Sequence, residues 1–233
     1  MFNKIIGSTS SVNQQGRWRD LFFRKSEVWK TTWMFRLLLI FLLGACFFIT
    51  RGCISEELAE SLVYRGIVIK SDAVIIENFD PNYLLFEETA KLVKAGQASR
   101  VFVPVSINGS GTGPNRVSQG FVEVMSRLSR IGSGYELIPV AEIEPIRLNA
   151  AQQIKNHLQD KGVQSIIVVS PGFSSKRSFL VYQSVFESTD IEVRCLPVFG
   201  DRNPANWSDT WHGVQEVFLE FGKLWYYKIV VLD

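Results

Sequence analysis

The sequence predicts an α/β fold: a doubly wound, mainly parallel sheet with helices on both faces, a Rossmann-like three-layer sandwich, preceded by one transmembrane helix. Short runs rich in Val and Ile alternate with amphipathic segments, which is the pattern of a parallel sheet covered by helices. A run without charged residues, from Leu37 to Thr50, precedes them. With 46% apolar and 12% aromatic residues among 233, the chain has ample material for a packed core.

The expected strands are continuous apolar runs, as in strands buried on both faces of a sheet. They are Gly66–Ile69, Ala73–Ile76, Arg100–Ile107, Glu136–Val140, Ser165–Ser170 and Glu192–Phe199. The expected helices are Tyr83–Ala95, Asn115–Ile131, Leu148–Lys161, Ser175–Glu187 and Trp211–Lys228. Gly96 and Gly162 follow two of these helices directly, as is typical of helix C-termini. We therefore expect one α/β domain at residues 64–233, preceded by a linker or short helix at 52–63.

The apolar run is long enough for a membrane anchor only if the span begins before it. The 14 residues from Leu37 to Thr50 cover about 21 Å as a helix, against about 30 Å of bilayer core. If Arg36 extends toward the headgroups, the span begins at Trp33 and reaches roughly 27 Å. The sequence thus predicts that residues 33–51 cross a lipid bilayer.

Charge predicts the orientation of this anchor. Residues 1–36 hold seven Lys/Arg and two Asp/Glu, which leaves 18 and 21 for the rest of the chain. By the positive-inside rule, the basic arm at 1–32 stays in the cytoplasm, and the domain lies outside, on a bacterial inner (plasma) membrane. Because the positive charge is on the arm and not on the folded domain, a nucleic-acid partner is not expected.

Two other interpretations of the N-terminus stay open. A cleaved signal peptide has an apolar region of this length, but its basic region is usually much shorter than 36 residues. The segment Leu43–Cys46 is similar to a lipoprotein signal, although the apolar run continues past Cys46. The arm itself is either an amphipathic segment on the inner leaflet or a flexible tail. Three cysteines without a paired spacing and two distant histidines predict neither a disulfide framework nor a metal site.

Ligands of doubly wound sheets bind beyond the carboxyl ends of the strands, so the loops after strands hold the candidate residues. The loop after Ser165–Ser170 leads into a helix with Ser174 at the N-cap position, where free N–H groups attract an anion. Two basic residues in the first helical turn oppose the helix dipole, and a bound phosphate or carboxylate would remove that conflict. The alternative is that both are solvated surface charges. The candidates here are Ser170, Ser174, Lys176 and Arg177.

Two further loops supply candidates. Asn108 and Gly109 begin a glycine-rich loop that lets backbone amides approach a phosphate, or that is simply a flexible connection. The loop after Glu136–Val140 contains Glu144, Arg147 and Asn149. A carboxylate there acts as a general base, binds a ligand hydroxyl, or forms a surface ion pair with Arg147.

Five segments, in order along residues 72–228, carry a resemblance to a known family. They are Ser71–Ile76, Ala90–Gly96, Asn149–Ile154, Ser165–Ser178 and Glu220–Tyr226. In these segments the chain resembles the YdcF/SanA/ElyC family of envelope-associated proteins. The resemblance implies an N-terminal membrane anchor and a Rossmann-like domain, and it adds Asp72 and Glu220, which agree with the family as Arg177 does, to the candidate binding residues.

The chain also departs from the family pattern. The family usually has Gly where Asn78 stands, a Ser-Gly-Gly turn at Pro104–Ser106, Arg near Leu85, and His where Ser174 stands. If the family chemistry uses that His as an acid or base, this chain lacks the group best suited to titrate near neutral pH. Anion binding through Ser174 and Arg177 does not require it.

Three functions follow, and the first is favoured. It is an anchored extracytoplasmic domain that binds a phosphorylated, nucleotide-like or lipid-linked ligand in envelope or surface-polysaccharide biogenesis. The second is a hydrolase or transferase that acts on such a ligand through Asp72, Glu144 or Glu220. The third is a ligand-free scaffold that binds an envelope protein partner through Trp207 and Trp211. No cofactor is identified from the sequence.

Overall fold

The computed structural model describes residues 33–80, 82–107 and 113–232, with the backbone alone at 47–54. The chain divides into two units, residues 1–49 and 50–233. The basic arm expected at 1–32 lies outside the described residues.

Helix α2 runs from Trp33 to Glu60 and continues from one unit into the next. Among the residues described, the search for a helix long and apolar enough to cross a membrane finds none. The segment 52–63, expected as a linker or a short helix, is helical as far as Glu60. Ala59 and Leu62 are buried in the second unit, so its core begins before residue 64.

The second unit contains a five-stranded sheet in which every pairing is parallel. The strands are β1 (Ala73–Ile76), β2 (Arg100–Ser106), β3 (Glu136–Val140), β4 (Ser165–Pro171) and β5 (Glu192–Val198), in the order β3-β2-β1-β4-β5. Val74 lies opposite Val101 of β2 and Ile167 of β4, so β1 is the central strand. The chain moves outward in one direction from β1 and in the other from β4, which makes the β1–β4 boundary the topological switch point.

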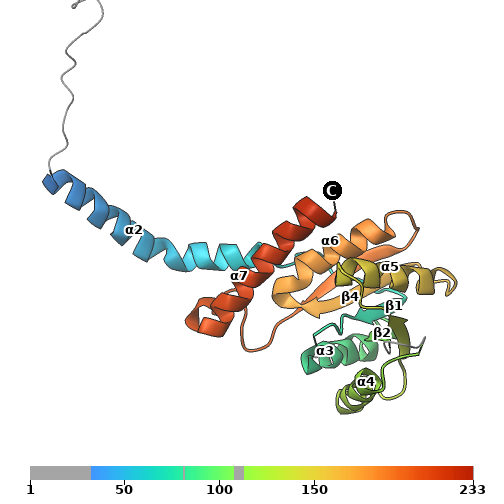
Figure 1. Ribbon diagram of the computed structural model, residues 1–233. Coiled ribbons are helices and arrows are strands. Elements are labelled where there is room, and N and C mark those ends of the chain that lie inside the picture. The colour runs from blue at the N-terminus through green and yellow to red at the C-terminus, as the bar shows by residue number, and fades with distance from the viewer. Residues whose placement is uncertain (1–32, 81, 108–112, 233) are drawn as a thin grey trace, which may run out of the picture. The chain divides into compact units, whose positions relative to one another are not determined.

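Helices cover both faces of this sheet (Figure 1). One layer holds α3 (Tyr83–Lys94) and α4 (Arg116–Leu128), and the other holds α5 (Ile146–Gln159) and α6 (Ser175–Phe186). Side chains alternate along a strand, so Ala73 and Ile75 pack in the core under α5 and α6, whereas Val74 and Ile76 pack under α3 and α4. The expected α/β, Rossmann-like architecture is confirmed.

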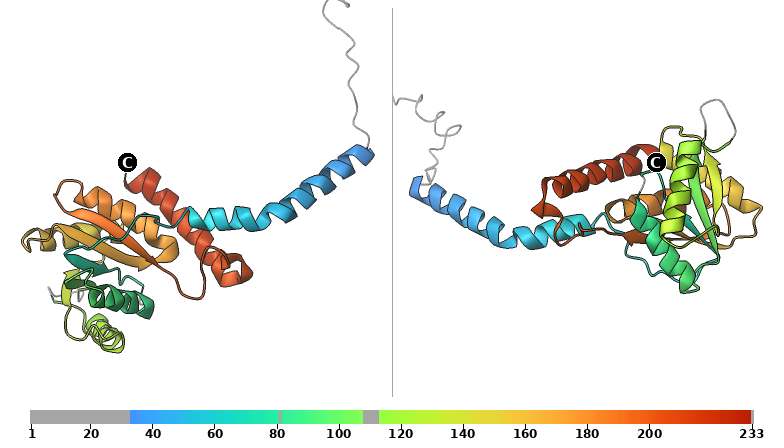
Figure 2. Two further views of the ribbon diagram at one scale, coloured as in Figure 1. Left: turned by 180° about the vertical axis from the view of Figure 1, so that it is seen from behind. Right: turned by 90° about the horizontal axis from the view of Figure 1, so that it is seen from below.

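A third cluster joins the last helix to the rest of the unit. Helix α7 (Trp211–Tyr226) lies beside the end of α2 in both views of Figure 2. Val217 and Leu224 of α7 pack with Ala59 and Leu62 and with Phe173. Phe173 belongs to the short 3-10 helix η1 (Gly172–Ser174); a second one, η2 (Trp207–Asp209), precedes α7, and a π-helical turn, η3 (Tyr227–Val231), follows it.

Local sequence accounts for several helix ends. Asn82, Asn115 and Thr210 each accept a hydrogen bond from a backbone N–H of the following turn, and so cap α3, α4 and α7. Gly96 and Gly162 have φ of 68° and 65°, which is the left-handed conformation that glycine adopts most readily after a helix.

One expected strand is wrong. Residues 66–69 are not in a strand, and Ile67 is 80% exposed. The β-branched residues there do predict a strand, but a strand forms only with a neighbour to pair with, and β2 and β4 occupy both edges of β1.

Candidate functional site

A buried polar cluster lies at the carboxyl edge of β1 and β4, the switch point of the sheet. The backbone N–H of Glu77 donates to Val169 O at 3.0 Å, so the pairing of β1 with β4 continues one residue past Ile76. Because side chains alternate, Glu77 and Ser170 extend to the face that α5 and α6 cover. Both are buried, at 1% and 0% exposed.

Glu77 is the centre of this cluster. Its Oε2 accepts hydrogen bonds from Arg147 Nη1 at 3.0 Å and from Ser178 Oγ at 2.6 Å. Arg147 Nη1 also donates to Ser178 Oγ at 2.6 Å. The ion pair is nearly closed to solvent, with side chains 0% exposed for Glu77 and 10% for Arg147. An ion pair taken out of water is expensive unless hydrogen bonds satisfy it, and here those bonds come from the first turns of two helices, α5 and α6.

Serine hydroxyls extend the cluster along the start of α6. Ser178 Oγ lies 3.0 Å from Ser170 Oγ, which lies 3.2 Å from Ser174 Oγ. Ser174 Oγ donates in turn to Pro171 O at 3.1 Å. This ladder connects the end of β4 to Glu77 through hydroxyls that both donate and accept.

Unpartnered polar atoms concentrate at the same edge. Five buried side-chain N or O atoms of the described residues have no hydrogen-bond partner, and four of them belong to Glu77 (Oε1), Asn78 (Oδ1), Arg177 (Nε) and Tyr182 (Oη). The fifth belongs to Ser126. An unsatisfied buried polar atom costs about 1–3 kcal/mol. Four unsatisfied polar atoms in one region of the fold therefore indicate that these atoms have a functional role.

Tyr182 lies one helical turn beyond Ser178 on α6 and is fully buried. Burial raises the pKa of its hydroxyl well above the ordinary value, and the negative charge of Glu77 raises it further. Tyr182 is therefore a neutral hydroxyl with a proton to donate.

A second ion pair borders the cluster. Arg177 Nη2 donates to Glu220 Oε2, and Lys223 Nζ donates to Glu220 Oε1 at 2.7 Å. Burial alone would raise the pKa of the Glu220 carboxyl, but the charge of Arg177 and the Lys223 bond outweigh it and hold the pKa below its ordinary value. The Arg177 guanidinium also lies over Tyr227, with Cζ 5.5 Å from the ring centre.

A pocket of about 260 Å³ lies on the other side of the same edge. Its walls come from the start of α3, from η1 after β4, and from the loop after β5. Asn82, Gly172 and Arg202 are among its lining residues, and Arg202 Nε donates to Glu216 Oε2 at 3.0 Å. The edge thus offers a closed polar cluster on the α6 side and an open pocket on the α3 side.

The structure brings some of the predicted site residues together. Ser170 and Ser174 belong to the serine ladder, and Arg177 and Glu220 form the second ion pair. Ser174 does occupy the N-cap position of α6, but its side chain makes no capping hydrogen bond. The alternative interpretation, that Arg177 is a solvated surface charge, is wrong, since its side chain is 5% exposed.

Two predicted residues shape the loop that presents Arg147. Asn149 Nδ2 donates to Ile143 O at 3.1 Å, and Glu144 Oε2 accepts from Ile146 N at 3.4 Å. Glu144 itself is exposed. The surface ion pair considered for Arg147 is wrong, because Arg147 is buried and pairs with Glu77.

Other predicted residues lie elsewhere. Asp72 is at the amino edge of the sheet, where its Oδ2 accepts from Gln164 N, Ser165 N and Ser165 Oγ at 2.9–3.1 Å. Hydrogen bonding, led by the Gln164 N–H, lowers its pKa. Asn108 and Gly109 lie outside the described residues. The three carboxylates considered for catalysis, Asp72, Glu144 and Glu220, are therefore not gathered in one place.

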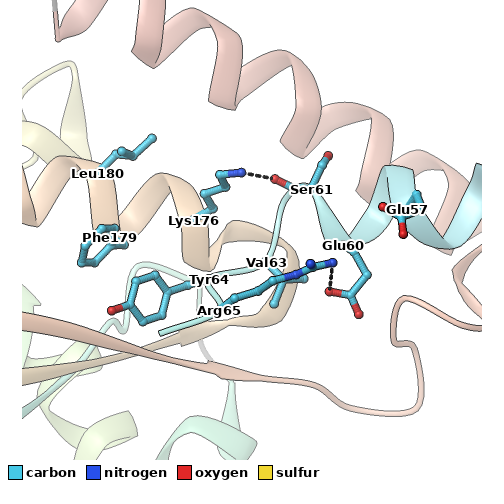
Figure 3. Close-up of a pocket in the computed structure, with 9 residues that line it drawn as sticks. All are labelled: Glu57, Glu60, Ser61, Val63, Tyr64, Arg65, Lys176, Phe179 and Leu180. Carbon is cyan, nitrogen blue, oxygen red and sulfur yellow. Dashed lines mark hydrogen bonds and ion pairs between the residues drawn. The ribbon is translucent and has the colours of Figure 1, made fainter. Parts of the chain in front are cut away.

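Lys176 points away from the cluster, into a pocket of about 410 Å³ beside the end of α2 (Figure 3). Its Nζ donates to Ser61 O at 2.9 Å, and Arg65 pairs with Glu60 in the same pocket. Both cations thus have partners. Trp207 is also not where it was expected, because it is 5% exposed and donates from Nε1 to Ser55 O at 2.9 Å, which removes it from a partner surface.

Sequence reasoning missed Glu77, Asn78 and Tyr182 as site residues. A signal for the first two was present, because both directly follow the Val-Ile-Ile run of β1 and strand ends were the places to search. Tyr182 carries no such signal, since an aromatic residue within an amphipathic helix predicts only core packing.

Comparison with known proteins adds no assignment. A scan against protein-family models gives no match, and neither does a search of curated protein sequences.

Proposed function

We propose that the α/β domain binds a small ligand at the carboxyl edge of β1 and β4. The observation that carries this proposal is the group of four unpartnered buried polar atoms, on Glu77, Asn78, Arg177 and Tyr182. Their position supports it, because ligands of doubly wound sheets bind at the switch point. The same edge of the sheet also carries an open pocket, on the side of α3.

The chemistry of these atoms favours a particular ligand class. Glu77 Oε1 and Asn78 Oδ1 are acceptors, so they call for hydroxyl or amide donors on the ligand. Arg177 Nε and the Tyr182 hydroxyl are donors, and they call for acceptor oxygens. A sugar or ribose carrying phosphate groups supplies both. Among phosphorylated, nucleotide-like and lipid-linked ligands, we therefore favour those that contain a sugar.

The charges of the cluster and of the pocket favour different parts of the ligand. Arg147 and Arg177 each face a carboxylate, so the cluster as a whole is not an anion site. Arg202 in the open pocket is 44% exposed, and its carboxylate partner is at the surface. We place the hydroxyl groups of the ligand at the cluster and its phosphate in the pocket beside Arg202.

The proposal includes a membrane anchor at residues 33–51 and a domain outside the cytoplasm. The uncharged run from Leu37 to Thr50 and the basic arm before it support this topology. The resemblance to the YdcF/SanA/ElyC family supports a role in envelope or surface-polysaccharide biogenesis. We propose a binding function and not a hydrolase or transferase, because Asp72 lies at the opposite, amino edge of the sheet and Glu220 is paired with Arg177 and Lys223.

The test is ligand-dependent thermal stabilisation of the full chain in detergent micelles. The panel contains nucleotides, S-adenosylmethionine, nucleotide sugars, sugar phosphates and polyprenyl-phosphate analogues. A ligand present at 100 times its Kd stabilises the folded state by about 2.7 kcal/mol. The informative variant is Asn78→Ala, which removes an unpartnered acceptor without breaking a hydrogen bond of the fold.

We expect a sugar-containing compound to raise the Tm of the wild type and to raise that of Asn78→Ala much less. Glu123→Gln is the matched control, because Glu123 is an exposed residue of α4 that pairs only with Arg127 among the contacts described. It should respond as the wild type does. If no compound changes the Tm, or if Asn78→Ala responds fully, the proposed site is wrong.

A further inference from the structure

Helix α7 exposes an apolar face, of which Phe218 also contacts the ring of the buried Trp207. Trp211, Phe218 and Trp225 follow one another at intervals of seven residues, and Ile229 comes one turn later; all four are at least half exposed. At about 100° per residue these positions share one side of the helix. Leu219, Tyr226 and Val230 widen this side, and each is also more than half exposed. We call these seven residues the α7 face, although Ile229 and Val230 belong to the π-helical turn η3 that continues α7.

The opposite side of the same helix is already buried. Gly213, Val217 and Leu224 pack inward, so α7 is apolar on both sides. A surface helix normally carries polar residues opposite its buried stripe, and a helix that is apolar all round is normally covered. The charged residues of α7 lie between the two sides, and two of them, Glu216 and Glu220, bond to other elements of the domain.

The α7 face is comparable in size with the largest apolar patch that a typical monomer exposes. From Trp211 to Val230 the helix rises about 29 Å, and side chains about 10 Å across give an area of roughly 300 Å². Apolar patches of this size are often functional, and the exposed Gln215 is a polar residue within this one.

We propose that the α7 face lies in the interfacial region of a phospholipid bilayer. Its composition favours lipid over a protein partner, because two Trp and one Tyr are the residues that gather at the boundary between headgroups and acyl chains. Lys228 borders the face, and basic residues at this depth attract anionic headgroups, whereas Lys223 is paired with Glu220. Lys228 Nζ lies 5.3 Å from the centre of the Trp225 ring, so an aromatic ring and a cation are presented together.

The chain connection points to the same surface. Leu224 and Val217 pack against Ala59 and Leu62, so α7 is held to the end of α2. Thr50 ends the uncharged run, and the helix from Thr50 to Ala59 rises only about 14 Å. This step rests on the membrane anchor of the proposed function: if residues 33–51 cross a bilayer, the helix that leaves it is the one whose end packs against α7.

The test is site-specific photocrosslinking of the full chain in vesicles of phosphatidylethanolamine and phosphatidylglycerol. A benzophenone amino acid replaces Phe218 in one variant and Ile229 in another. Val117 of α4 is the matched control, because it is an apolar residue that is 81% exposed on a helix of the opposite layer. We expect a several-fold excess of lipid adduct at Phe218 and Ile229 over Val117, measured by mass spectrometry.

Two results overturn the proposal. Adducts between two copies of the chain at Phe218 and Ile229, without lipid, would make the α7 face a homodimer interface. Equal yields of lipid adduct at all three positions would mean that the face contacts lipid no more than any exposed residue does. Carbonate extraction of the same vesicles tests the anchor separately: a chain that is released, yet carries lipid at Phe218, contradicts the anchor and supports the α7 face.

Discussion

Glu77 and Arg147 lie 70 residues apart in the chain, and their side chains form a buried ion pair with Nη1 and Oε2 3.0 Å apart. The pair joins the end of β1 to the first turn of α5, and Ser178 joins both to α6. Elements that are distant in the sequence thus meet at one carboxylate. The geometry of the candidate site depends on this contact.

Replacement of Arg147 by Met should destabilise the fold by about 3–5 kcal/mol, because it leaves the Glu77 carboxylate buried without its charge partner. Chemical denaturation measures the free energy of unfolding. The control is Arg127→Met, which breaks an exposed ion pair with Glu123 and should cost no more than about 1 kcal/mol. A loss for Arg147→Met as small as that of the control would mean that the buried pair has no structural role.

Stability should fall in acid partly because of Glu220. The pKa of this carboxyl lies below its ordinary value in the folded state, so the ionised carboxylate stabilises the fold. This stabilisation is fully present above the ordinary pKa, near 4.5, and is lost as the pH falls through the lowered pKa. The free energy of unfolding, measured between neutral pH and pH 3, should therefore depend less on pH in Glu220→Gln than in the wild type. Glu123→Gln should keep the wild-type profile. Parallel profiles for the wild type and Glu220→Gln would contradict the prediction.

A substitution of Asp72 distinguishes an effect on the stability of the sheet from an effect on ligand binding. Its carboxylate holds the start of β4 at the amino edge, away from the candidate site. Asp72→Ala should lower the Tm, by less than Arg147→Met does, because Asp72 is exposed to water. The ligand-induced rise in Tm should remain as in the wild type. If that rise disappears, then the amino edge takes part in binding and the site is misplaced.

The sheet was predictable from sequence because each strand is a local pattern. The bounds of β1 and β3 agree with the prediction at both ends, and the other three strands differ at one end by a single residue. The prediction of a strand at residues 66–69 is wrong because a strand needs a neighbouring strand as well as a high β-propensity. The sequence of the segment does not reveal whether such a neighbour is present.

The site was predictable only in part, for a different reason. The loop after β4 was predicted as part of the candidate site, and Ser170 and Ser174 do lie in the buried polar cluster, since strand ends are marked by the sequence. The ion pairs of the site were not predictable, because the partners of Arg147 and Arg177 depend on how α5, α6 and α7 cross. The basic residues expected to hold an anion are instead paired within the protein, and three of the four unpartnered atoms belong to Glu77, Asn78 and Tyr182, which were not among the predicted site residues.

Two glycines of α7 give a matched comparison. A Cβ at residue 213 would lie 2.0 Å from the backbone oxygen of Trp207, whereas a Cβ at residue 222 would meet no atom within 4 Å. Gly213→Ala should therefore displace η2 and the buried Trp207, with a loss of stability of about 2 kcal/mol or more and an altered tryptophan emission. Gly222→Ala should raise the free energy of unfolding by about 1 kcal/mol, because alanine is the better helix former. If both substitutions stabilise the protein equally, then the close approach of α7 to Trp207 does not exist in solution, and the packing of the α7 face relative to the core has to be revised.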